Sequence, residues 1–89
     1  MGKLKMPPAP NSLQIRAARA ALGWSSADLA QASGITRRTL QKAENDNDES
    51  EVRTSTRLAI KATLEAAGIE FIEAEDGAPG IIIRTAQTD

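Results

Sequence analysis

The chain contains no histidine and no cysteine. Without cysteine it has neither disulfide bonds nor thiolate metal ligands. Without histidine it lacks the commonest metal ligand, the usual proton shuttle and every histidine-dependent catalytic triad. The acidic run at 46–51 lacks the glycine and the final glutamate of an EF-hand loop, so we interpret it as a solvated acidic loop. The sequence therefore predicts a protein that is not an enzyme and that holds no metal or cofactor.

Aromatic residues are scarce, with one tryptophan, one phenylalanine and no tyrosine among 89 residues. Because 40% of the chain is hydrophobic, its core must consist mainly of alanine, leucine and isoleucine, which favours packed helices in one small domain. Long apolar runs are also missing, and the basic N-terminus lacks the apolar segment of a signal peptide. We therefore expect a cytoplasmic protein with no membrane partner.

The net charge is only −1, but the charges are unevenly distributed along the chain. Residues 1–42 contain seven lysines and arginines against one acidic residue, whereas residues 43–89 contain four against eleven. Such asymmetry indicates one face that is suited to a polyanion. The alternative is a chance clustering of charges on a solvated surface.

The positions of proline and glycine in the sequence predict how the chain is divided into segments. Three prolines and no periodic pattern near the N-terminus indicate a flexible arm. A first helix is expected from a cap at Asn11 or Ser12 to Leu22, with Gly23 as its left-handed stop. We predict an arm at 1–10, a helical domain at 11–68, a β-hairpin at 69–85 and a frayed tail at 86–89.

Two short helices are expected within the stretch SADLAQASGITRRTLQKAE at 26–44. Ser25 caps the first and Gly34 ends it, and Thr36 caps the second. Helical spacing places Leu40 inward together with Ala43, and it leaves a polar, basic face outward. A helix pair joined by a short turn with glycine is typical of the helix-turn-helix, whose second helix can enter the DNA major groove. The alternative is a solvated basic face on an ordinary helical bundle.

The segment LGWSSADLAQASGITRRTLQKAEN resembles the helix-turn-helix of the lambda-repressor-like Cro/repressor family. The resemblance extends over roughly residues 12–71 and rests on the joint spacing of several features: Arg19, Leu22-Gly23, Leu29-Ala30, Gly34-Ile35-Thr36, Leu40 and Glu44-Asn45. It implies a mainly α fold of four to five helices that binds double-stranded DNA. In this chain a C-terminal β-hairpin would follow.

The resemblance also implies roles for individual residues. Arg19 and Glu44 would form a structural ion pair. Four side chains of the second helix would face base edges: Arg37, Arg38, Gln41 and Lys42. Four residues would contact phosphates: Ser26, Thr36, Thr39 and Asn45. Arginine and glutamine are suited to base edges, because they can make paired hydrogen bonds to guanine and adenine respectively.

The C-terminal third combines a helix with two strands. A helix is expected from a cap at Thr54 or Ser55 through Ala67, with a short extra turn near Val52. The alternating pattern IEFIEAE then predicts a strand, and Ile81–Arg84 predicts a second strand after a turn at Asp76-Gly77. One small helical body cannot cover both faces of such a hairpin. We therefore expect a homodimer whose interface includes four apolar residues: Phe71, Ile81, Ile82 and Ile83.

These features favour a sequence-specific transcriptional regulator, most simply a repressor that binds a pseudo-palindromic operator as a dimer. Such a protein would act at the nucleoid of a prokaryote or phage host. The alternative is a DNA-binding antitoxin or adaptor whose hairpin holds a second small protein. A protein-interaction module without a DNA role is a third reading, which the net charge of −1 favours.

Overall fold

The computed structural model describes residues 9–45 and 52–84. Most of the predicted arm, the acidic run at 46–51 and the predicted tail lie outside these residues. Val52 and Arg53 lie within them and form no helical turn before Thr54, so the extra turn expected near Val52 is not seen in the part of the chain that the structure describes. The described residues form four helices and one antiparallel hairpin, as expected from the sequence. The elements are α1 (Ser12–Leu22), α2 (Ser26–Ser33), α3 (Arg37–Ala43), α4 (Thr54–Ala66), β1 (Ile69–Glu73) and β2 (Pro79–Ile83).

The first three helices begin at residues whose side chains accept a hydrogen bond from the first turn. Asn11, Ser25 and Thr36 accept from the backbone N–H groups three residues later, as is usual for such caps. At α2 the Asp28 carboxylate also accepts from the Ser25 N–H at 2.9 Å, which completes a capping box. Gly23 ends α1 with a φ of 70°, in the left-handed conformation that glycine adopts without strain.

The start of α4 differs from the sequence prediction. Thr54 is the first helical residue, and Arg53 occupies the cap position without a side-chain hydrogen bond. Neither Thr54 nor Ser55 therefore caps this helix. The helix ends at Ala66, one residue earlier than expected, and Gly68 follows with a φ of 104°. A β-carbon at Gly68 would collide with the Arg84 carbonyl, so glycine allows the end of β2 to approach this turn.

The core consists of aliphatic side chains from all four helices, together with the inner face of the hairpin. Its largest members are fully buried and include Phe71, Ile15, Leu29, Leu40, Ile60 and Leu64. Trp24 and Leu22 pack at its margin. Phe71 is 0% exposed inside its own chain, so its side chain is not available to a second copy. This corrects the expectation that Phe71 lies at a dimer interface.

The hairpin pairs β1 with β2 in a register that places Phe71 opposite Ile81 and Ile72 opposite Gly80. The second strand begins at Pro79, two residues before the predicted start at Ile81. Proline is tolerated here because alternate residues of an edge strand point their nitrogen away from the partner strand, so no ladder hydrogen bond is lost. The tip closes through a hydrogen bond from the Ala74 N–H to the Ala78 carbonyl at 2.7 Å.

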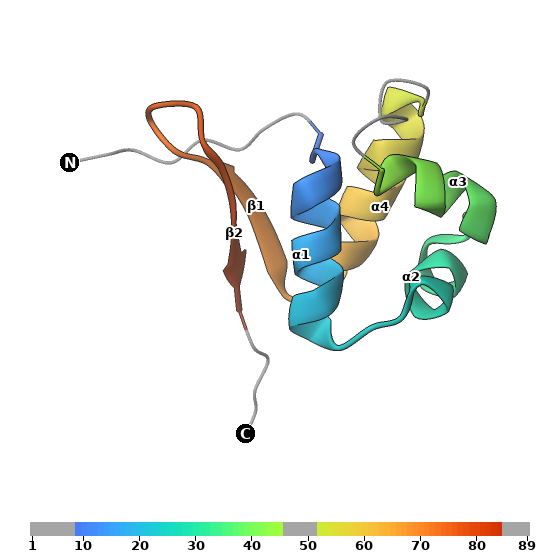
Figure 1. The fold of residues 1–89 in the computed structure, drawn as a ribbon. Helices are drawn as coiled ribbons and strands as arrows, with labels where there is room; N and C mark the ends of the chain where they lie inside the picture. Colours follow the sequence, from blue (N-terminus) through green and yellow to red (C-terminus); the bar gives the residue numbers. More distant parts are fainter. Residues whose placement is uncertain (1–8, 46–51, 85–89) are drawn as a thin grey trace.

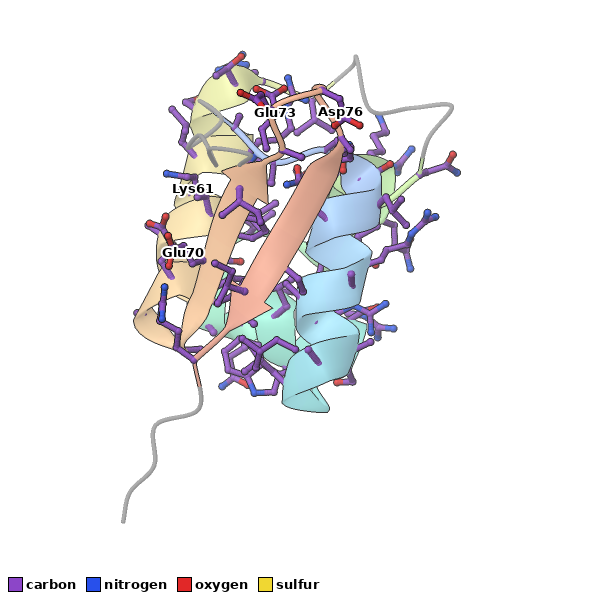
Figure 2. The ribbon with its side chains drawn as sticks, turned by 90° about the vertical axis from the view of Figure 1, so that its left-hand side faces the viewer. Lys61, Glu70, Glu73 and Asp76 are labelled. Carbon is purple, nitrogen blue, oxygen red and sulfur yellow. The ribbon has the colours of Figure 1, made fainter. Side chains whose placement is uncertain are left out.

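The hairpin and α3 lie on opposite sides of the molecule, with α1 and α4 between them (Figure 1). Seen face-on in Figure 2, β1 lies on the side of α4 and β2 on the side of α1, in agreement with their contacts. No helix among the described residues is long and apolar enough to cross a membrane.

Candidate nucleic-acid interface

Helix α3 has one buried side and one outward side. Leu40 and Ala43 are 0% exposed and hold the helix on the core. Arg37, Arg38 and Gln41 are exposed, and Lys42 is half-buried. Because these four residues are spaced i, i+1, i+4 and i+5, they share the side of α3 opposite the core. The structure thus brings the four predicted base-edge residues together on one surface, which we call the α3 face.

Two predicted phosphate contacts, Thr36 and Thr39, lie at the start of α3 and interact with each other. The Thr36 hydroxyl oxygen accepts the Thr39 N–H at 3.1 Å, and its proton is donated to the Thr39 hydroxyl at 3.0 Å. Thr36 is therefore occupied as a helix cap, and both hydrogen bonds of its hydroxyl group go to Thr39. Because the Thr36 proton is used in this pair, the Thr39 hydroxyl is the one of the two that can donate its proton to a phosphate.

The other two predicted phosphate contacts lie at opposite ends of the helix pair. Ser26 is the first residue of α2 and is half-buried. Asn45 is exposed and follows the end of α3, where its N–H donates to the Lys42 carbonyl at 3.2 Å. Ser26 and Asn45 thus lie outside α3 itself.

The end of α3 is attached to α1 by the ion pair that the family resemblance implied. Arg19 donates from Nε to Oε2 of Glu44 at 2.9 Å and from Nη2 to Oε1 at 3.0 Å. Its Nη1 also donates to the Trp24 carbonyl at 3.1 Å. The Arg19 side chain is 23% exposed and the Glu44 side chain 10%. This paired geometry fixes orientation as well as distance, because the planar guanidinium fits the carboxylate in one arrangement.

A second arginine of α1 supports the same end of α3. Arg16 donates from Nη1 to the main-chain carbonyl of Glu44 at 3.1 Å. From the sequence alone, Arg16 is only one of the seven basic residues within residues 1–42. The signal that could have found it is its position one helical turn before Arg19, which places both arginines on the same side of α1. Together they hold the α3 face in a fixed direction relative to α1.

The charged and polar groups of the site are suited to binding an anionic surface. Within the described residues, no group of three or more acidic side chains is close enough together to hold a metal. The α3 face carries three cationic side chains and one amide, which are the groups that contact phosphates and base edges in the major groove. The fold and the site define a helix-turn-helix DNA-binding domain.

Comparison with known families agrees with this conclusion. A family model described as Helix-turn-helix, of the Cro/C1 type, matches residues 15–61, which is more than half of the chain. The chain belongs to this helix-turn-helix family of DNA-binding regulators. Searches of curated proteins and of solved structures gave no significant match.

Proposed function

We propose that this regulator is a transcriptional repressor that binds a pseudo-palindromic operator as a dimer. The observation that supports the proposal best is the α3 face, where Arg37, Arg38 and Gln41 project outward from a helix whose other side is buried. A helix held in this way can enter the major groove as a rigid unit. One seven-residue helix contacts few base pairs, so a dimer that reads two half-sites about 34 Å apart explains how specificity is reached.

The proposed contacts fall into two groups. Arg37, Arg38, Gln41 and Lys42 read base edges, whereas Ser26, Thr36, Thr39 and Asn45 position the domain on phosphates. Thr39 donates its hydroxyl proton to a phosphate, and Thr36 contributes mainly by fixing the start of α3. Repression follows from occupying a promoter, which requires no further domain.

Selection of bound DNA from a random pool tests the proposal, because it yields both the half-site sequence and the half-site spacing. We expect two inverted half-sites and a steep loss of affinity with salt. Arg38→Ala should relax the base preference at one position of each half-site and weaken binding by about 1–3 kcal/mol. Thr39→Val, as a matched control, should weaken binding to all sequences alike. Failure to enrich any sequence at low salt would contradict the proposal.

A further inference from the structure

The two outer edges of the hairpin differ in exposure. Hydrogen bonds from Arg84 N to the Gly68 carbonyl and from Ala74 N to the Ala78 carbonyl set the phase of the ladder. In this phase the even-numbered residues of the two strands bond each other, and the odd-numbered residues point their N–H and C=O groups away from the partner strand. The outer edge of β1 is closed, because Phe71 is 0% exposed. The outer edge of β2 is open, since Ile83 is 50% exposed and Ile81 is only half-buried.

An apolar surface on α1 continues this open edge. Leu13 is 56% exposed, and Ala17 and Ala21 follow it at intervals of four residues with their side chains also exposed. Ala17 and Ala21 lie three and seven positions after Gln14, whose side chain reaches the hairpin, so they border the same side of the helix. None of these residues is charged. Two copies of this surface therefore meet without repulsion, and the alanines allow two helices to approach closely.

We propose that β2 pairs with β2 of a second copy about a two-fold axis at Ile82, which gives a four-stranded antiparallel sheet with α1 packed against its copy. This proposal deepens the proposed function, on whose dimer it rests. In this register Ile81 of each copy pairs with Ile83 of the other copy. Every backbone N–H and C=O group of these two residues then forms a hydrogen bond between the copies. A register shifted to Ile81 would instead oppose Ile83 to Pro79, which has no N–H to donate.

The outer face of the sheet fits this register. Gly80 and Arg84 would lie opposite each other across the new strand pair, so the long arginine side chain meets a residue that has no side chain of its own. Ile82 would contact its copy directly. The two Glu70 carboxylates, each already paired with its own Arg84 at 2.7 Å, would be three strand spacings or about 14 Å apart. The pairing creates no close contact between like charges.

The direction of the axis agrees with binding to one DNA duplex. A two-fold axis between adjacent antiparallel strands runs perpendicular to the sheet. Figure 2, turned by 90° from Figure 1, shows the hairpin face-on, so this axis runs across Figure 1 from the hairpin towards α2 and α3. Rotation about it keeps both copies of α3 on the same side of the dimer, opposite the sheet. That arrangement is what a palindromic site requires.

Cysteine cross-linking tests the register, because the natural chain has no cysteine. At the two-fold axis the two copies of residue 82 form a non-hydrogen-bonded pair, with Cα atoms about 4.5 Å apart, which suits a disulfide. We expect Ile82→Cys to form a covalent dimer completely under mild oxidation. Ile72→Cys, on the same outer face but on β1, should stay uncrosslinked. Equal cross-linking of the two variants, or none at residue 82, would overturn the proposal.

Oligomeric mass and DNA selection separate this proposal from the proposed function. Ile83→Pro removes an outward N–H while leaving the ladder within the hairpin intact, so the folded variant should sediment as a monomer. A native dimer that resists both Ile83→Pro and Ile82→Lys overturns the β2 pairing but leaves a dimeric repressor standing. A native chain that is monomeric, or that carries a foreign protein in equal amount, overturns the pairing as well. A residue 82 cross-link with no selected DNA supports the pairing and contradicts the proposed function.

Discussion

At the scale of single residues, Arg19 connects three parts of the fold. Its guanidinium bonds the Glu44 carboxylate at the end of α3 and the Trp24 carbonyl in the α1–α2 connection. Arg19→Ala removes one partner of a largely buried pair and leaves Glu44 without its charge partner. We expect a loss of about 3 kcal/mol in the free energy of unfolding, at the lower end for buried pairs because Arg19 is partly exposed. Urea denaturation measures this loss.

Two variants serve as controls for Arg19. Arg84 pairs with Glu70 at 2.7 Å, but its side chain is 64% exposed, so Arg84→Ala should cost less than about 1 kcal/mol. The double variant Arg19→Met/Glu44→Leu removes both charges and should recover part of the loss. If Arg19→Ala and Arg84→Ala lowered the free energy of unfolding equally, burial would not govern how much each ion pair contributes to stability.

Gln14 shows what the sequence could not reveal about single residues. The residue is 5% exposed, accepts the Asn11 N–H at 3.0 Å, and donates to the Ile72 and Gly80 carbonyls at 3.1 and 2.9 Å. Its role in the capping box is local and follows from the spacing to Asn11. The two bonds to the hairpin join residues that lie 58 and 66 positions apart, which no local pattern indicates.

Substitution of Gln14 should weaken the attachment of the hairpin to α1 more than it destabilises the helices. Gln14→Met keeps the length of the side chain and its helix propensity but removes three hydrogen bonds, each with a net contribution of about 1 kcal/mol. We expect a loss of about 2–3 kcal/mol and faster amide exchange in β1 and β2. Hydrogen exchange followed by NMR measures both. Gln31→Met, at an exposed position of α2, should change neither.

At the scale of elements, the helix boundaries follow from local chemistry and the edges of the hairpin do not. The sequence predicts Gly23 as the end of α1, because glycine adopts a positive φ without strain. It predicts Ser25 as the cap of α2, because side-chain capping depends only on neighbouring residues. The sequence predicts the second strand only from Ile81, because β2 residue Pro79 follows a turn signal and the outward direction of its nitrogen is set by the ladder phase. The burial of Phe71 depends likewise on which face of the hairpin meets α1 and α4. A period of two identifies a face but not the element that covers it.

The start of α4 offers a stabilising substitution. Arg53 occupies the cap with extended backbone angles, φ −62° and ψ 145°, and makes no side-chain bond to the helix. Arg53→Asp supplies an acceptor for the first turn and a negative charge at the helix N-terminus, which together should stabilise the fold by about 1 kcal/mol. Thermal unfolding measures the gain. Arg53→Ala isolates the effect of losing the arginine, and a gain equal to that of Arg53→Asp would show that capping is not the cause.

At the scale of the whole molecule, the net charge of −1 conceals an electrostatic polarity. The α3 face is cationic, whereas the hairpin side carries Glu70, Glu73 and Asp76, with Lys61 beside them (Figure 2). Helices α1 and α4 lie between these two surfaces (Figure 1). Because charges are screened over about 8 Å at physiological salt, the two surfaces act nearly independently. An acidic chain can thus present a cationic face to DNA.

This separation predicts that neutralising hairpin acids leaves DNA binding almost unchanged. The double variant Glu73→Gln/Glu75→Gln removes two negative charges far from α3. Its affinity for the selected site should therefore stay within about twofold of the native value at 0.15 M salt. Arg37→Gln changes one unit on the α3 face and should weaken binding about tenfold or more, because it removes a direct contact. Fluorescence anisotropy across a salt series measures both effects. As salt is lowered towards 0.01 M, the screening length grows to about 30 Å, so the hairpin charges begin to act on the DNA. A DNA affinity of the hairpin variant that increases gradually over this range reports that long-range electrostatic effect. A large gain already at 0.15 M would instead place the hairpin close to the DNA, and would contradict an axis that keeps the sheet on the far side of the dimer.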